Sequence, residues 1–150
     1  MVLVKKLPHY DSSFALPKYE TSASAGADLR ACFENKQGIW IAPWERCLIP
    51  TRLTFEFCPT LEGQIRPRSG ISLKTTLMIP NSPGTIDADY RGEVKIIMAN
   101  MGPEKIFITH GDRIAQIVFS KIEKVDFKSV EKLSSSQREK GGFGSTGLSN

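Results

Sequence analysis

The chain has 150 residues, of which 40% are hydrophobic, as expected for one globular domain with a single core. Its formal net charge of +4 suits a polyanionic partner, and nucleotides and nucleic acids both qualify. The sequence has no run of five basic residues, which disfavours a basic tail for nucleic acid, and no apolar run of membrane-spanning length.

The cysteines and histidines indicate the cellular compartment to expect and the kinds of metal site that are disfavoured. Cys32, Cys47 and Cys58 are odd in number and form no C-x-x-C motif, which predicts reduced, buried thiols. The apolar run at the amino terminus is too short for a signal peptide, so we expect a cytoplasmic protein. His9 and His110 lie far apart in the sequence, which disfavours a zinc site of the usual kind.

Apolar and polar residues alternate with a period of two along most of the chain, which predicts strands. The expected strands cover residues 53–57, 61–65, 93–100, 106–109 and 114–119. Prolines and glycines interrupt the pattern at short intervals, so we predict an all-β sandwich or barrel. One short helix is expected at 70–74, with Ser69 as its N-cap.

Residues 81–92 combine turn signals with two carboxylates and an aromatic ring. The Pro-Gly pair at 83–84 predicts a tight turn in a hairpin-like loop. In a strand, Asp87 and Asp89 would share one face and Tyr90 would lie on the other. Considered alone, such a stretch is more often an ordinary acidic turn.

The composition changes near the carboxyl end. Residues 134–150 contain only Phe143 and Leu148 as large apolar side chains, too few to offset the entropy of ordering the segment. The sequence therefore predicts a β domain over 1–133 and a flexible glycine-rich arm over 134–150. A single phenylalanine between glycines, close to Arg138, is unusual for a simple linker.

Five segments, in this order and at these spacings, resemble the five motifs of the trimeric dUTPases. They are residues 25–31, 66–74, 81–92, 111–119 and 141–147. Each motif alone is weak, but the five together are specific and cover nearly the whole chain. The resemblance implies a distorted jelly-roll barrel, a homotrimer with shared active sites, and an arm that closes over the nucleotide.

The resemblance also implies the reaction. Water attacks the α-phosphate of dUTP and releases dUMP and pyrophosphate, which keeps uracil out of DNA and supplies dUMP for thymidylate synthesis. Hydrolysis of a triphosphate needs cations for the phosphates, a positioned water and a shaped pocket. Without a nearby histidine, Asp87 is the candidate general base.

The candidate phosphate contacts begin with Arg68, Ser69 and Gly70, which supply a guanidinium, a hydroxyl and backbone N–H groups. A surface arginine beside an N-cap is the commoner situation in general. Arg138 and the glycine-rich arm would form a second phosphate-binding surface, although the arm is not a P-loop. Gln116 matches a phosphate-side position; a glutamine within an apolar run otherwise satisfies a core hydrogen bond.

The remaining assignments follow from the resemblance. Asn81 matches the contact to uracil, Tyr90 the ring under the deoxyribose, and Phe143 the ring that stacks on the base. Further substrate-binding positions are Gly84, Thr85 and Ile86 in the central loop and Gly144, Ser145 and Thr146 in the arm.

The cofactor implied is Mg²⁺, held mainly by the three phosphates and not by direct side-chain ligation. Asp28 belongs by resemblance to the metal and phosphate region; a structural partnership with an arginine is at least as well supported. Asp112 and Arg113 are expected to fix structure, with an ion pair at a strand start.

Two other functions remain open at this point. A dCTP deaminase shares the fold and much of the loop arrangement. The zinc deaminases are excluded because the H-x-E and P-C-x-x-C elements are missing, and the metal-free deaminases lack a matching arm with a stacking phenylalanine. The third possibility is a non-catalytic nucleotide-binding or regulatory protein on the same fold.

Overall fold

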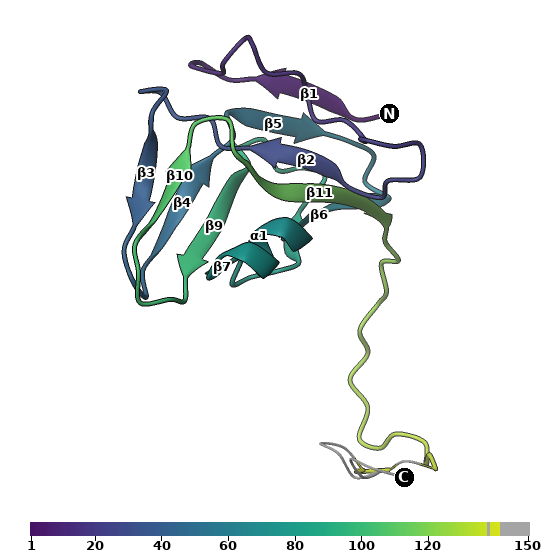
Figure 1. Cartoon of the computed structure of the whole chain (residues 1–150). Coiled ribbons are helices and arrows are strands. Elements are labelled where there is room, and N and C mark those ends of the chain that lie inside the picture. The colour runs from purple at the N-terminus through teal and green to yellow at the C-terminus, as the bar shows by residue number, and fades with distance from the viewer. Residues whose placement is uncertain (138, 142–150) are drawn as a thin grey trace.

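The computed structural model describes residues 1–137 and 139–141. In this part of the chain one short helix accompanies a series of short strands (Figure 1). Their bounds are β1 Leu3–Lys6, β2 Ala27–Arg30, β3 Gly38–Ile41, β4 Arg46–Pro50, β5 Leu53–Glu56, β6 Leu61–Arg66, α1 Ser69–Lys74, β7 Leu77–Met78, β8 Gly84–Ile86, β9 Lys95–Asn100, β10 Ile106–Thr109 and β11 Arg113–Lys121.

The strands form four small sheets, and every pairing is antiparallel. Their orders are β1-β5, β10-β3, β2-β11-β6-β8 and β4-β9-β7. The neighbours are mostly not consecutive in the chain, so the connections cross over and wrap the sheets around one interior as a distorted jelly roll (Figure 1). The predicted all-β class is confirmed.

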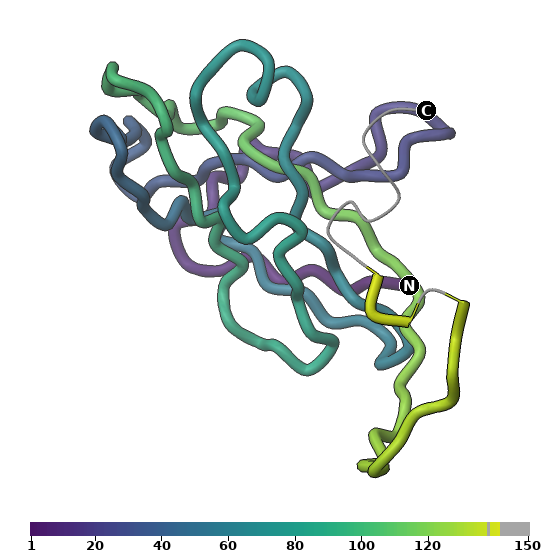
Figure 2. The backbone as a smooth tube through the Cα atoms, turned by 90° about the horizontal axis from the view of Figure 1, so that it is seen from below, coloured from purple at the N-terminus to yellow at the C-terminus, as the bar shows by residue number. Residues whose placement is uncertain are grey.

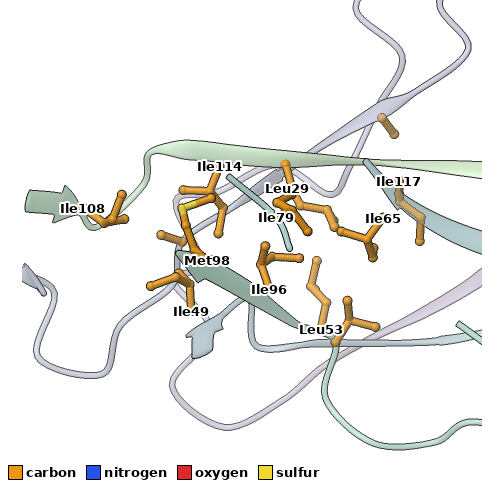
Figure 3. Close-up of a cluster of buried hydrophobic side chains, with 14 of the residues drawn as sticks. Leu29, Ile49, Leu53, Ile65, Ile79, Ile96, Met98, Ile108, Ile114 and Ile117 are labelled. Carbon is orange, nitrogen blue, oxygen red and sulfur yellow. The ribbon is translucent and has the colours of Figure 1, made fainter. Parts of the chain in front are cut away.

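The core consists of the inward-facing side chains of all the larger strands (Figure 3). Leu29, Ile65, Ile96, Met98 and Ile117 are each less than 5% exposed. Burying one such side chain contributes about 1.5–3 kcal/mol, which is why the period-two pattern specifies these strands so well. The five predicted strands are present, with bounds shifted by one or two residues at some ends.

The helix begins one residue earlier than predicted. Ser69 is the first helical residue, so its assignment as N-cap is wrong. Arg68 takes the cap position with an extended backbone (φ −94°, ψ 135°), and its carbonyl accepts the N–H groups of Ile71 and Ser72. Among the described residues no helix has the length and apolar composition needed to cross a membrane.

The three cysteines are free thiols in different surroundings. Cys32 is buried and Cys47 half-buried, and desolvation raises the pKa of both thiols. Cys58 is exposed in the turn after β5, so the prediction of a buried thiol is wrong there. Hydrogen bonding to Thr60 lowers the pKa of the Cys58 thiol. A turn before a proline faces solvent whatever the hydrophobicity of its residues.

The packed body of the molecule ends just after β11. The N–H of Ile122 donates to the carbonyl of Thr60 at 3.0 Å, and beyond it the described chain runs away from the strands (Figures 1 and 2). Phe127 is 96% exposed and Leu133 is 80% exposed. The boundary predicted at residue 133 lies within this extended segment and stays a prediction.

A buried asparagine joins β9 to its surroundings. The Nδ2 of Asn100 donates to the carbonyls of Glu104 at 2.7 Å and Ile41 at 3.2 Å. Its Oδ1 accepts the hydroxyl of Thr76 at 2.6 Å and the N–H of Gly102 at 3.0 Å. Asn100 is 0% exposed, so each of these bonds satisfies a group that water cannot reach.

We therefore expect Asn100→Asp to be strongly destabilising, because a carboxylate would face backbone carbonyls with no cation nearby. The expected loss in the free energy of unfolding is about 3–5 kcal/mol, measured by urea denaturation at fixed protein concentration. Asn35→Asp is the matched control, since exposed Asn35 uses only its Oδ1, which accepts the N–H of Gln37 at 2.9 Å. Equal free energies of unfolding for the two variants would contradict the conclusion that the buried Asn100 amide stabilises the fold.

Candidate active site

The central loop starts as a strand and continues as a turn. β8 pairs antiparallel with β6, and the N–H of Tyr90 then donates to the carbonyl of Asp87 at 3.1 Å. This bond closes residues 87–90 into a turn, so the prediction that Asp87 and Asp89 share one face of a strand is wrong. The strand ends at Ile86 because the chain must reverse before Gly92.

Tyr90 is fixed by the end of the same loop. Its hydroxyl donates to the carbonyl of Glu93 at 3.1 Å, and its ring lies against the backbone of Gly92. A Cβ atom on Gly92 would stand 2.5 Å from Cζ of Tyr90, so any side chain there would push the ring away. The ring is still 45% exposed and can serve as a wall for a ligand.

Four of the predicted site residues, Thr85, Ile86, Asp87 and Tyr90, line one groove of about 450 Å³, here called the loop groove. Asn81 and Gly84 are not among the residues that line the groove: Gly84 is the first residue of β8, next to Thr85, and Asn81 lies in the turn before that strand. A Cβ atom on Gly84 would stand 2.9 Å from Nδ2 of Asn81, which shows that the asparagine amide packs on the glycine backbone.

The carboxylate of Asp87 is exposed at the rim of the loop groove. It forms no hydrogen bond or ion pair with any residue in the described part of the chain. Its oxygens are therefore free to accept hydrogen bonds from water. Asp89 does not line the loop groove and belongs to a neighbouring hollow, which Asp87 also borders.

A second hollow of about 560 Å³, here called the arginine pocket, holds the predicted phosphate-side residues Arg68, Ser69, Gly70 and Gln116. Asp28 also lines this pocket, between two guanidinium groups. Its Oδ1 accepts Nε of Arg68 at 2.8 Å and its Oδ2 accepts Nη1 of Arg113 at 3.1 Å. The sequence left open whether Asp28 is a structural partner of an arginine, and in the structure it binds two of them.

These contacts also decide what Arg68 can offer a ligand. Its Nε is bound to Asp28, and its Nη1 donates to the backbone carbonyl of Arg113 at 3.2 Å. Nη2 forms no bond to the described residues and remains for an anion. The ion pair expected of Asp112 and Arg113 is not formed among the described residues: Arg113 pairs with Asp28, and Asp112 accepts the N–H of Thr109 at 2.8 Å.

Gln116 binds the backbone. Its Nε2 donates to the carbonyl of Pro67 at 2.9 Å, and a Cβ atom on Gly26 would stand 3.0 Å from its Cδ. The amide thus holds the segment that carries Arg68 against β11. Contact between Gln116 and a ligand stays a prediction.

The predicted site residues therefore fall into two groups that line different hollows of this single chain. The predicted arm residues, Arg138, Phe143, Gly144, Ser145 and Thr146, lie outside the described residues. In the described part of the chain, no group of three or more His, Cys, Asp or Glu side chains is placed to hold a metal ion.

Sequence reasoning missed Arg66, which lines the arginine pocket from the end of β6. An arginine just before a proline resembles an ordinary surface residue. The available signal was its spacing: Glu62, Gln64 and Arg66 alternate with buried Gly63 and Ile65, so the three polar side chains share one face.

Comparisons with known proteins identify the family of this chain. A sequence model of the dUTPase family matches residues 12–147. The chain is 45% identical over 142 residues to the deoxyuridine 5'-triphosphate nucleotidohydrolase of Mesorhizobium japonicum, covering 95% of this chain and 88% of that protein. It is 45% identical over 146 residues to the enzyme of the same name from an Anaeromyxobacter species, covering 97% of each.

The fold is also similar to that of solved structures. A dUTPase of Staphylococcus bacteriophage 80alpha, solved with dUpNHpp, superposes with a TM-score of 0.84 at 27% identity over 99% of both chains. The family model matches residues 12–147, which is most of the sequence. The two relatives are each 45% identical to this chain, an identity high enough to show common family membership. This chain belongs to the dUTPase family.

Proposed function

We propose that this protein hydrolyses dUTP to dUMP and pyrophosphate. The observation that carries the proposal is the unpaired carboxylate of Asp87 beside Tyr90 at the rim of the loop groove. A carboxylate that is free of cations and open to water can orient a water molecule and accept its proton as the oxygen attacks the α-phosphorus. The bond from that phosphorus to the bridging oxygen then breaks, and pyrophosphate leaves.

The loop groove is the proposed site for the base and sugar. Asn81 contacts uracil, assisted by backbone groups of Gly84, Thr85 and Ile86. Tyr90 packs under the deoxyribose, where an aromatic ring against the sugar would leave no room for a 2′-hydroxyl. A site whose polar groups must be hydrogen-bonded by the ligand discriminates between related nucleotides more strongly than a site with apolar contacts alone.

The arginine pocket is the proposed site for the phosphates. Arg68 offers its free Nη2, and Ser69 and Gly70 offer a hydroxyl and backbone N–H groups. The donor set fits a Mg²⁺ ion that enters with the triphosphate, because Asp28 is already bound by two arginines and leaves phosphate oxygens and water as ligands. When bound, such an ion neutralises phosphate charge.

The complete site is proposed to form between copies of the chain in a homotrimer. Base-side and phosphate-side residues line separate hollows of one chain, which supports sharing. Leu48 and Ile97 are cross-strand partners that line the loop groove, and Met78 lies on the same face of that sheet. Leu48 is 57% exposed and Met78 is 41% exposed, an apolar strip that a second copy would cover.

The arm over residues 134–150 is proposed to close on the bound nucleotide. Phe143 would stack on the base, while Arg138, Gly144, Ser145 and Thr146 would approach the phosphates. Closure would exclude bulk water and so strengthen the electrostatic contacts. We also propose a cytoplasmic location, where the three thiols stay reduced.

The substrate assay tests the proposal directly. We expect pyrophosphate release from dUTP, no ammonia release from dCTP, and poor turnover of UTP and dTTP. Ammonia from dCTP would favour the deaminase alternative. Binding of dUTP without either product would favour a non-catalytic nucleotide-binding protein.

Asp87→Asn tests the general base, since the amide keeps the shape of the side chain but removes the basic oxygen. We expect kcat for dUTP to fall by about 10²–10⁴-fold, with nearly unchanged affinity for dUpNHpp. Asp89→Asn is the matched control, because the same charge change then lies outside the loop groove. A variant at Asp87 that keeps more than about a tenth of wild-type kcat would exclude this residue as the base.

Mixed oligomers test whether the site is shared. Asp87→Asn and Arg68→Gln chains, each inactive alone, are co-expressed with different tags and purified as heterotrimers. If Asp87 and Arg68 of one site come from neighbouring chains, each purified heterotrimer regains about one of its three sites, because one of its three chain pairs supplies both intact residues. If both residues act within one chain, the mixture stays as inactive as its parents.

A further inference from the structure

A row of polar side chains crosses the outer face of the sheet β2-β11-β6-β8. Gln116 of β11 is the cross-strand partner of Asp28 in β2 on one side and of Arg66 in β6 on the other. Directly paired residues of antiparallel strands project from the same face of a sheet. Arg66 therefore lies beside Gln116 and lines the arginine pocket together with Arg68.

Arg66 differs from the two other arginines of this pocket because no carboxylate of the described chain forms an ion pair with it. Arg68 and Arg113 are both in ion pairs with Asp28, at 2.8 Å and 3.1 Å. Arg66 forms no ion pair with any residue of the described chain, and Glu20, the other carboxylate that lines the pocket, forms none either. The guanidinium of Arg66 is thus the pocket cation that no carboxylate offsets at contact distance.

The side chain of Arg66 is nevertheless held in place by a neutral group. Its Nε donates to Oε1 of Gln64 at 3.0 Å, and its Nη2 donates to the same oxygen. Nε2 of Gln64 donates in turn to Oε1 of Glu62 at 2.6 Å. A guanidinium has five N–H groups, so Arg66 keeps three of them, including both on Nη1, for a ligand.

We infer that Arg66 is a further substrate-binding residue, which donates hydrogen bonds to the triphosphate chain of the nucleotide. The ligand must be a polyanion, because the pocket presents an unbalanced, partly oriented guanidinium beside Ser69 and Gly70. The base and sugar are not its targets, since the residues that would bind them line the loop groove. The inference rests on the proposed function and adds a cation to its phosphate site.

Calorimetry with Mg²⁺ present tests this role through two ligands, dUpNHpp and deoxyuridine, of which only the first carries phosphates. For Arg66→Gln we expect affinity for dUpNHpp to fall about 10–150-fold, the usual effect of losing one charged hydrogen bond. Affinity for deoxyuridine should be unchanged. Arg66→Lys should recover part of the loss, because the charge returns without the planar fork.

Lys5→Gln is the control for loss of one positive charge, since exposed Lys5 lies on β1 and lines neither hollow. It should bind both ligands as the wild type does. The difference between wild type and Arg66→Gln should also shrink as NaCl is raised, because salt screens the exposed guanidinium.

Equal affinities of wild type and Arg66→Gln for dUpNHpp would overturn the inference. An equal loss for deoxyuridine would overturn it too, by showing that Arg66 only supports the structure. Wild-type protein that binds dUpNHpp but releases no pyrophosphate from dUTP would overturn the proposed hydrolysis alone. A wild type that does not bind dUpNHpp would overturn both.

Discussion

The pairing of β11 with two neighbours is the constraint on which the arginine pocket depends. Its residues Arg113–Lys121 bond to β2 on one side and to β6 on the other, which brings Asp28 and Arg66 together on either side of Gln116. Side chains alternate between the faces of a sheet, so a slip of one residue would send Gln116 into the core and expose Ile117. The burial of Ile117, which is 1% exposed, therefore fixes the face that Gln116 presents to the pocket.

The two hollows have opposite electrostatic characters, and each suits a different task. In the arginine pocket Asp28 divides its charge between Arg68 and Arg113, which orients both guanidiniums without filling all their N–H groups. In the loop groove the carboxylate of Asp87 has no cationic partner among the described residues, so its oxygens stay open to solvent. This difference supports the proposed division of tasks, with the phosphates in the first hollow and the water in the second.

The strands could be predicted from the sequence because alternate burial is a local pattern, as Leu53 and Phe55 of β5 and Ile65 of β6 show. The features that could not be predicted depend on contacts between distant segments. Arg68 replaces Ser69 at the helix cap while its side chain is bound by Asp28, 40 residues earlier. The motifs predict which residues form the candidate site, but only the sheet register shows that Arg66 lies beside Gln116.

The packing of the Tyr90 ring on the backbone of Gly92 limits which substitutions the two positions can accept. A side chain at position 92 would displace the ring at position 90 from its present place, because the new Cβ atom would stand 2.5 Å from Cζ. Position 90 cannot lose its phenol without releasing the carbonyl of Glu93, which the hydroxyl binds at 3.1 Å. The two positions are therefore coupled, since a side chain at position 92 would disturb both the ring of Tyr90 and its hydrogen bond to Glu93.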